Sequence, residues 1–167
     1  TTVNDILDLS KLEAGRMSFL SNPFRPNDTI GQVLKSFKKM ARDKSIILSH
    51  KHEGKELTLL GDEFRLKQVL NNLVSNAIKY TSKGKVDIAS RIIAIGGEVS
   101  LKVEVADTGI GIAPDKIDKI FDEYSRVHDE TPEKWIIGTG LGLAVTKKLI
   151  NQMGGELNIQ IHRNKRT

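Results

Sequence analysis

The chain has 167 residues, of which 38% are hydrophobic and 28% are charged, and its formal net charge is +5. This length predicts one domain with a hydrophobic core of its own. The absence of cysteine excludes disulfides, thiolate metal ligands and a cysteine nucleophile. No run reaches the roughly 20 apolar residues that a membrane-spanning helix needs, so a membrane anchor of the parent protein, where one exists, is expected outside this segment.

The positive net charge raises nucleic acid as a partner. The densest basic cluster, residues 35–44, follows the polar side of an amphipathic stretch whose apolar side carries Ile30, Val33 and Phe37. A second cluster lies in the tail, at Arg163, Lys165 and Arg166. Other basic residues are scattered, and aromatic residues do not alternate with the basic ones as stacking platforms for bases. We therefore predict no nucleic-acid binding.

Hydrophobic periodicity predicts the elements of the first half of the chain. An apolar stripe at helical spacing predicts a helix at the start, which Gly15 ends. After two prolines, Asn27 or Asp28 is expected to cap the second helix. The predicted helices span residues 2–14, 28–43 and 63–80, and the predicted strands span residues 16–21, 45–50 and 57–60.

The second half begins with a predicted hairpin whose strands meet at Gly96-Gly97. The predicted strands span residues 85–95, 98–107 and 156–161, and the predicted helices span residues 115–121 and 140–153. Together the elements predict an antiparallel or mixed sheet with helices on one face. This is an α+β fold, a two-layer α/β sandwich.

Two asparagines stand on one face of the predicted helix over residues 63–80. Asn72 and Asn76 are four positions apart, so their side chains are neighbours on the helix surface. Asparagine is unfavourable inside a helix, whereas its amide oxygen is a neutral ligand suited to Mg²⁺. Lys79, further along the helix, can bring a positive charge to phosphate groups. A pair that only hydrogen-bonds the backbone is the other explanation.

A carboxylate and two glycines follow the predicted hairpin, in the sequence Asp107-Thr-Gly109-Ile-Gly111-Ile112. A carboxylate at the end of a strand can accept a hydrogen bond from an amino group such as that of adenine. The two glycines let the backbone pass close to a flat base. A tight turn that begins with aspartate explains the same residues without a ligand.

A second group of glycines, Gly138, Gly140 and Gly142, lies at the start of the predicted helix over residues 140–153. Exposed N–H groups and the partial positive charge of a helix N-terminus would suit phosphate. The motif is not a Walker loop, because no Lys-Ser or Lys-Thr pair follows it. Its glycine spacing also differs from that of the dinucleotide fingerprint.

Between the two glycine motifs lies a long stretch without clear periodicity, residues 122–139. Loops of this length are usually functional or disordered. At its edge, Phe121 and Tyr124 predict an apolar hinge for a mobile lid, and core aromatics at helical spacing are the alternative.

The order and spacing of these four motifs resemble those of the ATP-binding domain of sensor histidine kinases (HATPase_c), in the GHKL superfamily with its Bergerat fold. Residues 72–81 are similar to the N box, residues 107–112 to the first glycine box, residues 121–124 to the F box and residues 138–143 to the second glycine box. The opening sequence NDILDLSKLEAG is similar to the end of the second dimerisation helix of these kinases.

The resemblance implies a role for each motif. Asn76 would bind Mg²⁺, Asp107 would bind the adenine amino group, and residues 122–139 would form a lid over ATP. The nucleotide-binding residues that the resemblance implies are Asn72, Asn76, Lys79, Tyr80, Asp107, Gly109, Gly111, Ile112, Tyr124, Arg126, Gly138, Thr139, Gly140, Leu141, Gly142 and Leu143.

The resemblance also implies how the domain works. It would bind ATP and Mg²⁺ and supply the phosphoryl group for autophosphorylation of a histidine on separate dimerisation helices, with a response regulator or receiver domain downstream. It would be a cytoplasmic domain. Residues 1–15 would be the end of the second dimerisation helix, and residues 16–167 the catalytic domain, shortened at its C-terminus. The segment alone is expected to be monomeric and not to autophosphorylate.

The sequence departs from the family pattern in two places. The closing glycine-serine-threonine segment and the last strand are absent, and so is the phosphoacceptor helix. Four histidines are present: His50, His52, His128 and His162. None is expected to be the acceptor, so no catalytic residue is assigned.

Two alternatives remain beside a histidine kinase domain. One is a degenerate nucleotide-binding module that acts by docking, and the other is a different GHKL protein, an ATPase or a serine kinase. Hydrolytic members of the superfamily carry a glutamate one turn before the metal-binding asparagine, where this chain has Asn72. An amide takes up no proton at neutral pH, which favours phosphotransfer over hydrolysis.

Overall fold

The computed structural model describes residues 2–122 and 140–160, and the chain falls into two compact units. The larger unit is Ser18–Ile110, and the smaller combines Thr1–Met17 with Gly111–Thr167. None of the described helices is long and apolar enough to cross a membrane.

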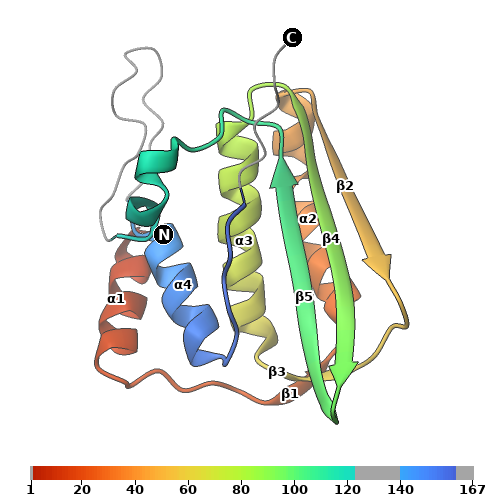
Figure 1. Cartoon of the computed structure of the whole chain (residues 1–167), viewed down its shortest axis with the longest axis vertical. Coiled ribbons are helices and arrows are strands. Elements are labelled where there is room, and N and C mark those ends of the chain that lie inside the picture. Colours follow the sequence, from red (N-terminus) through yellow and green to blue (C-terminus); the bar gives the residue numbers. More distant parts are fainter. Residues whose placement is uncertain (1, 123–139, 161–167) are drawn as a thin grey trace. The chain divides into compact units, whose positions relative to one another are not determined.

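The larger unit alternates strands with two long helices before it ends in a hairpin (Figure 1). Its elements are β1 (Asn22–Phe24), α2 (Pro26–Asp43), β2 (Ile46–Glu53), β3 (Leu59–Gly61), α3 (Glu63–Tyr80), β4 (Gly84–Ile95) and β5 (Glu98–Asp107).

The main sheet of the larger unit has the strand order β2-β4-β5. β2 pairs with β4 in parallel, and β4 pairs with β5 in antiparallel. Helices α2 and α3 cover one face of this sheet (Figure 1). The predicted α+β fold, with a mixed sheet and helices on one face, is therefore confirmed.

The core lies between this sheet and the two helices. Alternate residues of β4 point inward, so that Val86, Ile88 and Ser90 are buried while the residues between them are more exposed. The helices contribute buried apolar residues at helical spacing. The core cluster consists of Ile30, Val33, Leu34, Ala41, Ile46, Leu70, Val74, Ala77, Ile78, Val86 and Ile88.

The two long helices begin in different ways. In α3, Asp62 is the N-cap and its Oδ1 accepts a hydrogen bond from the Arg65 N–H at 3.0 Å. The predicted caps of α2 are wrong, because that helix begins at Pro26, before Asn27. Its N-cap is Arg25, which makes no side-chain capping bond. Proline suits the first helical position, since its fixed φ matches the helix and the N–H that it lacks would have no partner within the helix there.

The predicted strand over residues 16–21 is wrong. These residues alternate in hydrophobicity, but a strand also needs a partner, and here the Leu20 N–H donates to Asp62 Oδ2 instead. The short strand β1 forms just afterwards and pairs with β3 in a two-stranded sheet, where Pro23 stands opposite Leu60.

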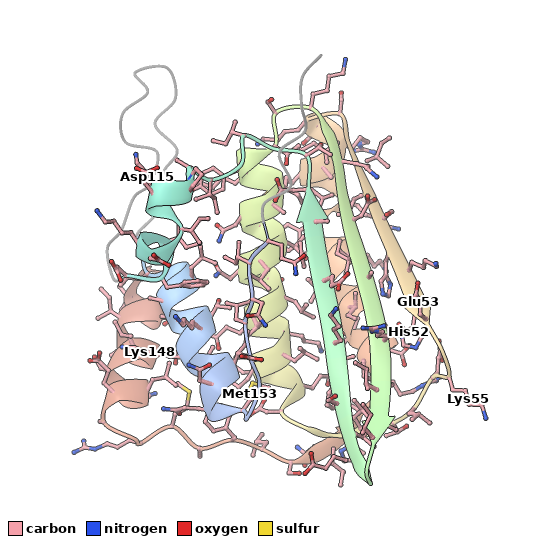
Figure 2. The ribbon with its side chains drawn as sticks, in the orientation of Figure 1. His52, Glu53, Lys55, Asp115, Lys148 and Met153 are labelled. Atoms are coloured by element: carbon pink, nitrogen blue, oxygen red, sulfur yellow. The ribbon has the colours of Figure 1, made fainter. Side chains whose placement is uncertain are left out.

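The smaller unit contains α1 (Thr2–Glu13), the 3₁₀ turns η1 (Pro114–Lys116) and η2 (Asp118–Phe121), and α4 (Gly142–Gln152). Two side chains of α4 bond to α1: Lys148 Nζ to Glu13 Oε1 at 2.7 Å, and Gln152 Nε2 to the Leu12 carbonyl at 3.1 Å (Lys148 in Figure 2).

Two predicted elements of the smaller unit differ in the structure. The helix expected over residues 115–121 consists of two short 3₁₀ turns. The closing strand expected over residues 156–161 does not form in its described part, because residues 155–160 are irregular and pair with no described strand.

Candidate functional site

The asparagine pair lies on the middle of α3, and its two side chains contact each other. Asn76 Nδ2 donates to Asn72 Oδ1 at 3.4 Å, and both residues are partly buried. This bond uses one of the two N–H groups of the Asn76 amide and leaves its oxygen unused, so the oxygen can serve as a ligand. The pair follows directly from the spacing of four, which places both side chains on one helix face.

The last turn of α3 carries the next two predicted residues. Lys79 Nζ lies 5.0 Å from the centre of the Tyr80 ring, which is a cation–π distance. Both residues are partly buried. The helix ends where Thr81 adopts an extended conformation and its N–H bonds the Ala77 carbonyl.

The turn after β5 is joined to this end of α3. The Gly109 N–H donates to Asp107 Oδ1 at 2.8 Å, and the Ile110 N–H donates to the Tyr80 carbonyl at 3.2 Å. Glycine is required at 109, because a Cβ there would lie 2.5 Å from the Tyr80 oxygen and 2.8 Å from Asp107 Oδ1. The structure therefore brings Asp107 and Gly109 together with the end of α3.

Two residues that support this turn were not predicted from the sequence. Thr108 Oγ1 accepts a hydrogen bond from the Lys85 N–H at 3.0 Å, which fastens the turn to β4. Lys44 donates from its ammonium group to the carbonyls of Ile78, Lys79 and Thr81 at 2.8, 3.0 and 3.4 Å. A lysine just after an amphipathic helix gives no sequence signal of such a role, because solvated lysines are common there.

The remaining predicted residues that the structure describes belong to the smaller unit. Gly140 has a φ of +72°, and the fully buried Leu141 is the N-cap of α4. The residues of this unit in the predicted set are Gly111, Ile112, Gly140, Leu141, Gly142 and Leu143. Tyr124, Arg126, Gly138 and Thr139 lie outside the described residues, as does most of the predicted lid over residues 122–139.

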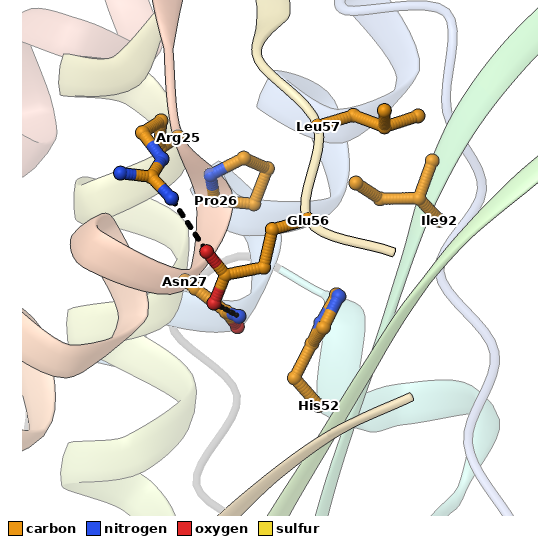
Figure 3. A pocket seen from close by; sticks show the side chains of 7 residues that line it. All are labelled: Arg25, Pro26, Asn27, His52, Glu56, Leu57 and Ile92. Carbon is orange, nitrogen blue, oxygen red and sulfur yellow. Dashed lines mark hydrogen bonds and ion pairs between the residues drawn. The ribbon is translucent and has the colours of Figure 1, made fainter. Parts of the chain in front are cut away.

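A pocket elsewhere in the larger unit is lined by Arg25, Pro26, Asn27, His52, Glu56, Leu57 and Ile92, none of which is a predicted site residue (Figure 3). Glu56 crosses it, bonded to Arg25 and to Asn27 Nδ2. His52 Nδ1 lies 2.9 Å from Ser90 Oγ, while its buried Nε2 has no hydrogen-bond partner among the described residues. The tight fit of these side chains leaves little room for a ligand, so the residues at the end of α3 remain the candidate site.

The groups at the end of α3 fit a magnesium-bound purine nucleotide chemically. An amide oxygen is a hard neutral ligand for Mg²⁺, and Asn76 offers one. Asp107 Oδ1 is held by a backbone N–H, whereas no group among residues 2–122 and 140–160 donates to its Oδ2. Gly109, without a side chain, allows the backbone to lie against Tyr80.

Comparison with known proteins identifies the family of the chain. The model of the family described as "Histidine kinase-, DNA gyrase B-, and HSP90-like ATPase" matches residues 61–167. The sensor histidine kinase GacS of Pseudomonas protegens is 39% identical over 160 residues, which cover 94% of this chain and 17% of GacS. The signal transduction histidine-protein kinase BarA of Escherichia coli is 37% identical over 166 residues, which cover 98% of this chain and 18% of BarA.

Among solved structures, full-length ShkA in complex with AMPPNP has a TM-score of 0.77 at 33% identity, over 91% of this chain and 30% of ShkA. By the coverages given above, this chain spans less than a fifth of the length of GacS and BarA. Because the family model matches well over half of it, the chain belongs to the family of histidine kinase-, DNA gyrase B- and HSP90-like ATPases.

Proposed function

We propose that this chain binds ATP together with Mg²⁺ and supplies the phosphoryl group for autophosphorylation of a histidine on separate dimerisation helices. It would do so within a longer two-component sensor kinase, with a response regulator or receiver domain downstream. The observation that carries the proposal is the hydrogen bond from Ile110 to the Tyr80 carbonyl, which joins the Asp107 turn to the helix of the asparagine pair. The names of GacS and BarA and the AMPPNP complex of ShkA support the same function.

Asp107 is the residue that would select the purine. Its Oδ1 is held by Gly109, so the carboxylate has a fixed orientation and Oδ2 can accept a hydrogen bond from the exocyclic amine of adenine. Guanine has a carbonyl oxygen at the corresponding position, so two hydrogen-bond acceptors, this oxygen and the carboxylate of Asp107, would face each other. A carboxylate held in this way therefore favours ATP over GTP.

Asn76 would direct its amide oxygen to Mg²⁺, since its nitrogen donates to Asn72. Lys79 would add a positive charge near the phosphates. Magnesium-bound ATP supplies a reactive γ-phosphoryl group, and phosphoryl transfer asks the protein mainly to position that group and to balance its charge. The chain's own residues do both without a catalytic base.

Asn72 favours transfer to a histidine over hydrolysis. A general base that activates water needs a lone pair that can take up a proton at neutral pH, and an amide has none. Asn72 Oδ1 also accepts a hydrogen bond from Asn76, so its position is fixed beside the metal ligand. The nucleophile would accordingly come from another segment.

Calorimetric titration with ATP tests the binding step. We expect saturable binding with Mg²⁺, weaker binding with EDTA, and weaker binding of GTP. Asp107→Asn should reduce the preference for ATP over GTP by about tenfold, the size expected for one hydrogen bond to a charged group. If the wild-type chain showed no saturable binding, the docking-module alternative would stand instead.

The transfer step is tested with radiolabelled ATP and a separate fragment that contains the phosphoacceptor helices of the parent kinase. We expect label on the fragment that is lost in acid and kept in base, as phosphohistidine behaves. Label that survives acid would assign the chain to a serine kinase, and release of inorganic phosphate without labelling would assign it to an ATPase.

A further inference from the structure

The last carbonyl groups of α3 are bonded from several directions. These carbonyls have no partner within the helix. Thr81 N–H bonds the Ala77 carbonyl, and Ile110 N–H bonds the Tyr80 carbonyl. The Lys44 ammonium bonds the carbonyls of Ile78, Lys79 and the cap residue Thr81. Every carbonyl in this turn therefore has a donor, and most of them depend on Lys44.

The Lys44 contacts are charge-assisted hydrogen bonds. An ammonium group has three N–H donors, one for each of its three carbonyl partners. Hydrogen bonds from a charged donor are about twice as strong as neutral ones, and a positive charge at a helix C-terminus also interacts favourably with the helix dipole. Because the partners are main-chain atoms, the contact fixes the end of the helix itself.

We infer that Lys44 is a positioning residue of the nucleotide site. It fixes the last turn of α3, which carries Lys79 and Tyr80, and through the Tyr80 carbonyl it fixes the turn that carries Asp107. Lys44 touches only backbone atoms of these residues, so it acts on the nucleotide through them. The inference rests on the proposed function and assigns a further residue to the same site.

Three variants separate this role from a general effect of charge. Lys44→Met removes the ammonium group and keeps a long side chain. Lys44→Arg restores a cation with several donors. Lys39→Met is the matched control, because it also removes one positive charge, and the ammonium group of Lys39, an exposed residue of α2, bonds to nothing in the part of the chain that the structure describes.

The first readout needs no nucleotide. In two-dimensional NMR spectra, Lys44→Met should shift the amide signals of Thr81 and Ile110 and raise their hydrogen-exchange rates about tenfold, because the turn opens more often. Lys39→Met should leave both signals in place. Unchanged Thr81 and Ile110 amides in Lys44→Met would overturn the inference and leave the proposed function untouched.

The second readout is ATP binding at a temperature where every variant is folded. Lys44→Met should weaken Mg²⁺-ATP binding about tenfold and lower the preference for ATP over GTP, and Lys44→Arg should recover most of both. A purely structural role would lower the unfolding midpoint of Lys44→Met without changing its affinity, and that result would overturn the inference. A wild-type chain that binds no ATP would instead overturn the proposed function, and the nucleotide role of Lys44 with it.

Discussion

The amide oxygen of Asn76 is the metal ligand that the proposal needs, so this residue offers the sharpest single substitution. Asn76→Ala removes the oxygen and should weaken ATP binding at least about tenfold, with no remaining dependence on Mg²⁺. Asn71→Ala makes the same change at an exposed position of α3. Calorimetry with and without Mg²⁺ compares the two, and equal affinities would remove Asn76 from the site.

Gly109 allows a second test at the residue scale. In Gly109→Ala the new Cβ would overlap the Tyr80 carbonyl oxygen, so the turn has to move and Asp107 with it. We expect at least about a tenfold loss of ATP affinity. Gly31→Ala is the control, because a Cβ at this exposed position of α2 meets nothing within 4 Å. It should leave binding unchanged and stabilise the fold by about 0.5–1 kcal/mol.

The sequence alone points to those residues of the candidate site whose chemistry is visible in their own side chains. Asn72 and Asn76 stand out because amides are costly in a helix, and Asp107 stands out because it precedes glycines. Lys44 and Ile110 could not be found in this way. Their roles depend on which backbone carbonyls fold beside them, and main-chain hydrogen bonds between distant segments leave no pattern in the chain.

At the scale of elements, β2 carries two histidines on the inner side of the sheet. His50 Nε2 and His52 Nδ1 lie 3.1 and 2.9 Å from the hydroxyl oxygen of the buried Ser90. Burial, together with the charge that His52 would carry, lowers the pKa of His50 below its ordinary value of 6.5. The folded chain therefore disfavours protonation of His50, whereas the unfolded chain accepts the proton at 6.5.

This difference makes stability depend on pH. As the pH falls through 6.5, His50 binds a proton in the unfolded state but not in the folded state. The free energy of unfolding should therefore fall until the pH reaches the lowered pKa of His50. Urea unfolding between pH 8 and about 5 measures the slope. His50→Gln should flatten it. Hydrogen bonds from Lys85 and Ser49 lower the pKa of Asp87, so this carboxylate loses its contribution only in more acidic solution, below its ordinary pKa of 3.8.

The elements differ in how far the sequence predicts them. The β4–β5 hairpin is predicted with its turn, because alternation and the pair Gly96-Gly97, both at positive φ, are local signals. The strand predicted over residues 16–21 fails, because alternation does not provide a partner. The predicted cap of α2 fails for a related reason, since Pro26 already starts the helix and Asn27 bonds to Glu56.

At the scale of the whole molecule, nucleotide binding should raise the stability of the chain. A ligand that binds only the folded state at about a hundred times its Kd adds about 2.7 kcal/mol to the free energy of unfolding. For a chain of this length we expect the unfolding midpoint to rise by about 5–10 °C with ATP and Mg²⁺. Differential scanning calorimetry measures the shift, and GTP at the same concentration should give a smaller one.

The parallel pairing of β2 with β4 has a consequence for how the molecule folds. Ile46 lies opposite Gly84, with the whole of α3 between them in the chain, whereas β4 and β5 meet across two residues. Contacts of long sequence separation form slowly, because the chain loses the entropy of a large loop before these contacts contribute favourable energy. The hairpin is therefore expected to form early and the β2 edge late, so substitutions that weaken the hairpin turn should slow folding, whereas substitutions at the β2 edge should mainly speed unfolding.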